Sequence, residues 1–384
     1  MQPAHDIRRE EGPAANPWGL PRARVLSLVS QKGGVAKTTS TVNLGAALAL
    51  SGHRVLIIGT DPQCGVSRTL GYSPDGLHGG LTEVLLSDLP LSQVAHDTAL
   101  DGLSMVVPDA WSLAEEQRYK QSLVDEQEVF LAAVDEARDE WDTILIDCPP
   151  GFGPETRAAL AASDALLVPV QAEELCRDSL KRLMEFVRAL DAASGRATEL
   201  EGFFLTMVDA RTRLTRHVID AMEAEYGERL LQTSIPRTTR LAEMALKGRP
   251  TVIYDRLSSG SRAYFDLADE IQVRWLQRPE QERRTSAPVA RPERRAAAED
   301  ADDADGDSML SGLSRFMQAL AGEAPSRPKP NLSHDTEADW GDDDEELEDP
   351  DLVSLDDLLD EEESRSFDPR RDWGLGEDDY DTIN

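Results

Sequence analysis

The chain has few cysteines and no long apolar run. Only three cysteines occur among 384 residues, Cys64, Cys148 and Cys176, and none forms a Cys-x-x-Cys pair. This spacing argues against a disulfide framework, and an iron–sulfur site lacks support because Cys148 has no matching partner in the sequence. No apolar run approaches the length of about 18 residues that a membrane span needs. We therefore expect a cytoplasmic protein with reduced thiols, no signal peptide and no membrane partner.

Basic residues are also few, and the excess of acidic residues over them is unevenly distributed along the chain. The chain has 40 Lys and Arg against 73 Asp and Glu, a formal net charge of −33. Residues 299–384 hold 30 acidic and 6 basic side chains, so this segment alone carries −24. The acidity therefore belongs to a tail, and the rest of the chain is balanced enough to carry a local basic face.

One glycine-rich stretch points to a phosphate site. An apolar, β-branched run ends at the sequence QKGGVAKTT, and an Ala- and Leu-rich segment follows to Leu50. This order predicts a strand, a loop that holds phosphates and a helix. Gly33 and Gly34 free the backbone to turn its N–H groups inward, and the helix dipole adds positive potential. We expect Lys37 to contact the β- and γ-phosphates and the Thr38 hydroxyl to bind Mg²⁺. The alternative, a glycine-rich turn that binds nothing, does not explain the flanking strand and helix.

The loop departs from the usual P-loop pattern at two positions. Lys32 precedes the glycines, and Ala36 replaces the glycine before Lys37. In this the loop resembles the deviant Walker A box of the ParA/MinD ATPase superfamily. The resemblance implies that ATP is bound by Lys32, Gly33, Gly34, Val35, Ala36, Lys37, Thr38 and Thr39. It also implies that Lys32 reaches across a dimer interface to the partner's nucleotide. Alanine at position 36 still offers its N–H, provided that the position does not need a positive φ.

Two aspartates follow buried strands. Asp61 begins an Asp-Pro-Gln element after the strand expected at residues 54–59, and Asp147 ends the apolar run 141–147 before Cys-Pro-Pro-Gly. Carboxylates at neighbouring strand ends can bind the Mg²⁺ shell and orient an attacking water. In the ParA family, Asp61 matches the hydrolytic aspartate of the Walker A′ motif and Asp147 the Walker B aspartate. Each aspartate alone is also compatible with a turn or a capping role. Asp61 lacks the aspartate that more often precedes it in the family and the Gly-Asn that follows, which allows slow or altered hydrolysis.

Alternating apolar segments predict an α/β fold. Further strands are expected over 103–108, 165–170 and 202–208, with helices over 81–86, 111–138 (broken near 124–125), 174–190 and 261–275. We therefore predict a P-loop NTPase fold, a twisted and mainly parallel β-sheet with helices on both faces. Three isolated histidines, His5, His78 and His96, are interpreted as solvated surface.

The domain boundaries follow from composition. Residues 1–22 are predicted to form a flexible arm, 23–278 the ATPase domain and 279–384 a disordered acidic tail. Within the tail, residues 309–320 and 352–359 are candidates for short interaction helices. The alternative for the whole tail is a solubilising role.

A basic cluster follows the last predicted strands. Its members are Arg211, Arg213, Arg216, Arg229, Arg237, Arg240 and Lys247. Charge alone is compatible with a merely solvated face. The segments MVDART and IPRTTRLAE, however, closely resemble the ParA/Soj partition ATPases, which implies that Arg211 and Arg240 bind DNA without sequence preference. The same resemblance implies that Pro236 lines the adenine pocket.

The family resemblance implies an ATP-driven partition cycle. An ATP-bound homodimer would bind the nucleoid, and a ParB-like partner would stimulate hydrolysis and release DNA, for chromosome or plasmid segregation. Two alternatives remain open: a relative that positions a protein cargo on the nucleoid, and a MinD-like membrane ATPase. The second needs a basic amphipathic C-terminal helix, whereas this chain ends in acidic residues.

Overall fold

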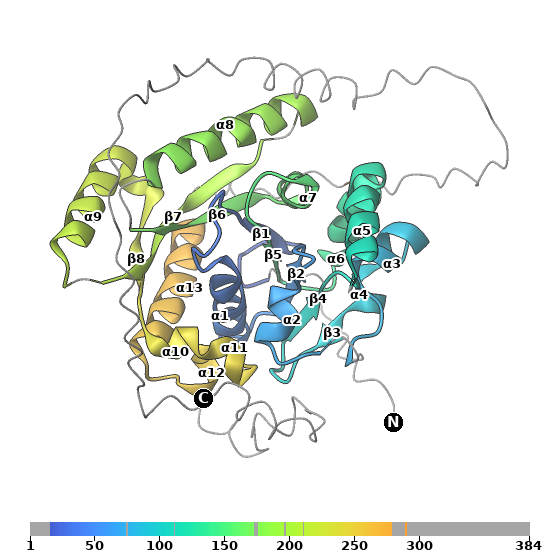
Figure 1. Ribbon diagram of the computed structural model, residues 1–384, viewed down its shortest axis with the longest axis horizontal. Helices are drawn as coiled ribbons and strands as arrows, with labels where there is room; N and C mark the ends of the chain where they lie inside the picture. The colour runs from blue at the N-terminus through green and yellow to red at the C-terminus, as the bar shows by residue number, and fades with distance from the viewer. Residues whose placement is uncertain are drawn as a thin grey trace, which may run out of the picture. The chain divides into compact units, whose positions relative to one another are not determined.

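The computed structural model describes residues 16–278, except 74–75, 111, 173–175, 196 and 210, together with residue 289. Eight strands form one sheet in the order β3-β4-β2-β5-β1-β6-β7-β8 (Figure 1). The strands are β1 (Arg24–Leu28), β2 (Val55–Gly59), β3 (His96–Asp97), β4 (Leu103–Val106), β5 (Thr143–Asp147), β6 (Ala165–Gln171), β7 (Glu199–Val208) and β8 (Leu230–Pro236). Every pairing is parallel except that of the short edge strand β3 with β4. The predicted α/β class and mainly parallel sheet are therefore confirmed.

Helices cover both faces of the sheet. Those with roles below are α1 (Lys37–Leu50), α5 (Leu113–Asp125), α6 (Gln127–Ala137), α7 (Pro154–Ala162), α8 (Cys176–Ser194), α9 (Arg213–Tyr226), α10 (Thr239–Ala242) and α13 (Ser259–Gln277). The shorter helices are α2 (Gly65–Thr69), α3 (Leu81–Ser87), α4 (Leu91–Val94), α11 (Met244–Lys247) and α12 (Thr251–Tyr254), with a 3₁₀ turn at Gly227–Arg229. Figure 1 shows α1 beside α13 on one face of the sheet. It shows α5, α6 and α7 together in another part of the domain, away from these two helices.

Alternation along the strands divides the interior into two apolar cores. Successive strand side chains point to opposite faces, so Val25 joins one core and Leu26 the other. The first core also receives apolar residues of helices α5 to α9, and the second those of α1 and α13. Because both faces are covered, the central strands are mostly apolar, which is the pattern read from the sequence.

Residues 16–22 differ from the predicted flexible arm. Trp18 is fully buried, and its indole Nε1 donates a hydrogen bond to Thr143 Oγ1 at 2.7 Å. Trp275 Nε1 donates to the Trp18 carbonyl at 3.0 Å, and Asn16 Oδ1 accepts from the Trp18 and Leu20 amides. The prediction of an arm is wrong for these seven residues, because Pro and Gly content does not reveal a tryptophan that packs on a distant helix. Residues 1–15 lie outside the described part.

Two other local predictions have clear outcomes. The helical region after residue 111 breaks at Glu126, between α5 and α6, as its pattern indicated. The solvated interpretation is wrong for His96, which is 5% exposed and packs edge-on against His78 with 4.3 Å between ring centroids. Burial lowers the pKa of His96. His5 and the tail segments 309–320 and 352–359 fall among the residues that the structure leaves undescribed.

Candidate nucleotide site

The glycine-rich loop joins the central strand β1 to α1 at the carboxyl edge of the sheet. β1 lies between β5 and β6, so residues 29–36 emerge at the middle of that edge. Ligands of open α/β sheets bind at this edge. On the far side of the loop, Thr206 Oγ1 of β7 donates to the Val35 carbonyl at 3.2 Å. The loop is thereby tied to β7 as well as to β1, from which it emerges.

Ala36 has a backbone conformation that favours glycine. It precedes α1 with φ 64° and ψ 32°, in the left-handed region, and Gly34 has φ 74°. The condition under which alanine was expected to be harmless is therefore not met. An L-residue in this region costs on the order of 1 kcal/mol relative to glycine. The departure from the usual glycine thus places strain at the mouth of the site.

The start of α1 offers hydrogen-bond donors. Within the described residues no side chain caps this helix, and its first turn holds no acidic residue. The unsatisfied N–H groups and the helix dipole attract an anion. Gly33 and Gly34 are exposed, and a Cβ on Gly34 would meet nothing described within 4 Å. The loop therefore presents accessible backbone N–H donors. Thr39 follows in the first turn of α1 and is half-buried.

Lys37 places a buried cation inside the loop. Its side chain is 7% exposed, and its Nζ donates to the Lys32 carbonyl at 2.9 Å. Burial lowers the pKa of Lys37, while the nearby carboxylates of Asp147 and Asp61 act to raise it. A poorly solvated ammonium beside free backbone donors is suited to phosphate. Lys32 itself is half-buried at the loop's rim.

Asp147 is fully enclosed at the end of β5. Its Oδ2 accepts from Thr38 Oγ1 at 2.7 Å and its Oδ1 from Thr41 Oγ1 at 2.9 Å. Burial raises the pKa of Asp147 to about 6, although the two threonine bonds and Lys37 act to lower it. Thr41 was missed by sequence reasoning. Its signal was the spacing of three residues from Thr38, which puts both hydroxyls on one side of α1.

Asp61 is held next to Asp147 by hydrogen bonds from the preceding residue to the Asp147 backbone. Thr60, which immediately precedes it, donates from both N and Oγ1 to the Asp147 carbonyl, each at 2.9 Å. Asp61 is half-buried, and its Oδ1 accepts from the Gln63 amide at 2.9 Å. The structure thus brings Asp61, Asp147, Thr38 and Lys37 to one edge, as predicted. This donor set fits a nucleotide phosphate with Mg²⁺: a buried cation for the phosphate, and a hydroxyl and carboxylates for the metal.

The predicted DNA contacts lie on neighbouring loops of the same edge. Strands β7 and β8 end side by side, with Val208 opposite Pro236. Arg211, just after β7, is 90% exposed and forms a 2.7 Å ion pair with Asp209. Arg240, on α10 after β8, pairs with Glu243 at 3.2 Å and with Asp255 at 3.1 Å. Sequence reasoning did not foresee these carboxylate partners. Pro236 is half-buried and is the last residue of β8, a strand that the sequence analysis did not predict.

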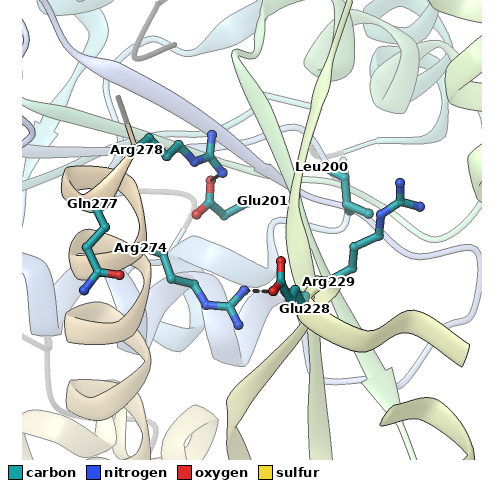
Figure 2. Close-up of a pocket in the computed structure, with 7 residues that line it drawn as sticks. All are labelled: Leu200, Glu201, Glu228, Arg229, Arg274, Gln277 and Arg278. Atoms are coloured by element: carbon teal, nitrogen blue, oxygen red, sulfur yellow. Dashed lines mark hydrogen bonds and ion pairs between the residues drawn. The ribbon is translucent and has the colours of Figure 1, made fainter. Parts of the chain in front are cut away.

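A separate cavity lies at the opposite edge, where β7 begins. It measures about 420 Å³, and Glu201, Arg229, Arg274 and Arg278 are among the residues that line it (Figure 2). Arg278 pairs with Glu201, and Arg274 donates to the Glu228 carbonyl at 2.8 Å. Since nucleotides bind at carboxyl ends of the strands, this cavity is not the nucleotide site.

Comparison with known sequences agrees with this geometry. The AAA-domain family matches residues 23–200. The chain is 34% identical over 248 residues to the sporulation initiation inhibitor protein Soj of Bacillus subtilis, which covers 65% of this chain and 98% of Soj. It is 35% identical over 254 residues to the chromosome partitioning protein ParA of Caulobacter vibrioides, covering 65% of this chain and 93% of that protein.

Solved structures share the fold. A structure described as cobyrinic acid a,c-diamide synthase from Mycobacterium smegmatis, with bound ATP analogue and magnesium, is 29% identical with a TM-score of 0.56. It covers 66% of this chain and 96% of its own. The septum site-determining protein MinD of Pyrococcus horikoshii, complexed with Mg-ADP, is 25% identical with a TM-score of 0.55, covering 65% and 96% respectively.

The fold and the site define a P-loop ATPase that uses ATP and Mg²⁺. The chain belongs to the Soj/ParA family of partitioning ATPases within the ParA/MinD superfamily, as its loop sequence indicated. In the part of the chain that the structure describes, no helix combines the length and apolarity required to cross a bilayer.

Proposed function

We propose that the chain is an ATP-controlled partition ATPase that dimerises with ATP, binds nucleoid DNA without sequence preference and is released by partner-stimulated hydrolysis. It would serve chromosome or plasmid segregation with a ParB-like partner. One observation supports this most: the phosphate loop and both candidate DNA-contact loops occupy the same edge of one sheet. The hydrogen bond from Thr206 to Val35 links β7, whose end carries the Arg211 loop, to the nucleotide loop. Nucleotide state and DNA contact therefore have a short physical connection.

Each residue of the site has a proposed role. The Lys37 ammonium and the amides of α1 bind the phosphates, and Pro236 lines the adenine side. Asp147 and the Thr38 hydroxyl, already in contact, hold Mg²⁺, which neutralises charge on the transferred phosphoryl group when bound. Asp61 orients the attacking water, since it lies beside Asp147 but is more accessible to solvent. Lys32, half-buried in the same loop, serves the partner subunit's nucleotide.

Dimerisation explains why DNA binding would follow nucleotide state. Each DNA phosphate that a protein cation neutralises releases counterions. It contributes about 0.9 to the slope with which the logarithm of DNA affinity falls against the logarithm of salt concentration. Two arginines per subunit give a slope of about 2 for one subunit and about 4 for a pair, because the pair presents both faces at once. Raising salt from 50 to 200 mM would then weaken a monomer about tenfold and a dimer on the order of 100-fold. Strong salt dependence is thus expected only from the dimer.

The test measures duplex binding by the full chain under three conditions: a non-hydrolysable ATP analogue, ADP and no nucleotide. We expect tight, salt-sensitive binding only with the analogue. Lys37→Ala, which removes the phosphate cation, is the matched control and should bind weakly in all three. Equal binding of the unaltered chain in the three states would refute the proposal. Asp61→Ala should remain on DNA with ATP, and normal ATP turnover by that variant would contradict the role of Asp61.

A second candidate function is positioning of a protein cargo on the nucleoid by the same cycle. It is favoured by one observation: the alignment with Soj leaves about a third of this chain unmatched, and the chain ends in the acidic segment 299–384. Fluorescence imaging in cells that lack the protein would decide. Mislocalised chromosome origins support segregation, and normal origins with a misplaced protein cluster support the alternative.

A further inference from the structure

Helix α5 buries few of its side chains, yet one of them contacts the carboxyl edge of the sheet beside Asp61. Of its thirteen residues only Tyr119, Ser122 and Leu123 are buried. Tyr119 has no exposed surface, and its hydroxyl donates to the Thr60 carbonyl at 3.2 Å. That carbonyl belongs to the peptide bond between Thr60 and Asp61. A single phenol thus fixes the peptide plane that leads into the carboxylate proposed to orient water.

Thr60 is held from two directions. Its amide and hydroxyl donate to the Asp147 carbonyl, which fixes it to β5, and its own carbonyl accepts from Tyr119, which fixes it to α5. The spacing between the backbones of Asp61 and Asp147 is therefore set by the threonine, and the orientation of Asp61 by the tyrosine. Loss of the phenol hydroxyl would leave the first contact intact and release the second.

The Tyr119 hydroxyl acts as a hydrogen-bond donor and does not merely fill space. An apolar ring would fill the same space, whereas a buried hydroxyl is costly unless it forms a hydrogen bond. Tyr119 has one proton to donate, and the structure directs it to Thr60. Burial raises the pKa of Tyr119 well above its ordinary value, so the group remains a donor over the physiological range.

The next residue of α5 makes a second connection to the site. Lys120 Nζ lies 2.6 Å from Glu116 and 3.8 Å from Glu155, a buried residue in the first turn of α7. Helix α7 follows the loop that leaves Asp147. One turn of α5 therefore contacts residues that follow both candidate catalytic strands, β2 and β5.

We propose that Tyr119 is a positioning residue for ATP hydrolysis, holding the Thr60–Asp61 peptide so that Asp61 orients the attacking water. The inference rests on the proposed role of Asp61. Nucleotide binding does not depend on this contact, since Lys37 and Thr38 lie on α1 and make their own bonds. The effect is therefore confined to the hydrolytic step.

The test compares Tyr119→Phe with the unaltered full chain. We expect kcat for ATP hydrolysis to fall roughly three- to tenfold, the effect of one lost hydrogen bond, with unchanged KM and nucleotide affinity. Tyr72→Phe is the matched control, because its hydroxyl also donates to a backbone carbonyl, that of Asp97 at 2.9 Å. This control should hydrolyse ATP at the parent rate.

The outcomes separate this inference from the proposed function. A parent-like kcat in Tyr119→Phe overturns the inference, and so does a parallel loss of kcat and nucleotide affinity, which would indicate general loosening of the fold. If Asp61→Ala hydrolyses slowly while Tyr119→Phe is normal, only the positioning role fails. If Asp61→Ala hydrolyses normally, the role of Asp61 fails first and the positioning role with it.

Discussion

Replacing Asp147 with asparagine is expected to stabilise the nucleotide-free protein and to abolish its response to Mg²⁺ and ATP. The carboxylate is fully buried, and its pKa is raised to about 6 from an ordinary 3.8. A pKa that differs by about 1 between the folded and unfolded states corresponds to about 1.4 kcal/mol, so the charged form costs up to about 3 kcal/mol at neutral pH. Asparagine removes that charge and keeps an oxygen that can accept from Thr38 or Thr41.

The pH dependence has a definite sign. Because the folded state binds the Asp147 proton more tightly than the unfolded state, stability falls as pH rises from about 4 to about 6 and stays low above that range. Lys37 loses a neighbouring anion in the variant, which offsets part of the gain. We therefore expect a net gain of about 1–3 kcal/mol at pH 8, or about 3–10 °C in Tm for a domain of this size. Below pH about 4 the gain should disappear.

The assay is thermal unfolding of both chains at several pH values, with and without ATP and Mg²⁺. The unaltered chain should gain Tm with ATP and Mg²⁺, and Asp147→Asn should not, because a neutral amide is a poor magnesium ligand. Asp220→Asn, at an exposed site on α9, removes the same charge and should leave Tm unchanged. An Asp147→Asn chain no more stable than the parent at pH 8 would refute the reasoning.

The remaining predictions concern stability. Ala36→Gly should raise the free energy of unfolding by about 1 kcal/mol, because φ at this position is 64°; denaturant titration that shows no gain would contradict the strain. Arg24→Met should cost about 3 kcal/mol, since it leaves the fully buried carboxylate of Glu201 with Arg278, at 3.4 Å, as its remaining ion-pair partner. The double variant with Glu201→Gln should recover much of this loss, and a double variant no more stable than Arg24→Met would disprove the pairing argument.

Much of the nucleotide site was predictable from short segments. The loop with Lys32 and Lys37, and the aspartates that follow two apolar strands, lie within local patterns of a few residues. Because parallel strands end at a common edge, these segments converge once the α/β pattern is recognised. The sheet, the position of α1 and the approach of Asp61 to Asp147 follow from that rule, and the structure agrees.

Other features required the tertiary structure. The positive φ of Ala36 depends on how the loop packs, and the ion pair of Arg240 with Asp255 joins two segments on either side of α11 and α12. Trp18 bonds to Thr143 across 125 residues, and Tyr119 bonds to Thr60 across 59. Composition classed the first segment as mobile and gave no sign of the second contact.

The sequence by itself indicated the chemistry, because the candidate phosphate and magnesium ligands lie in contiguous motifs, and the order of strands along the chain sets where these motifs emerge. Only the folded chain decided which buried hydroxyls and carboxylates hold those motifs in place. Such contacts pair residues far apart in the sequence, and their partners are chosen by packing rather than by local periodicity.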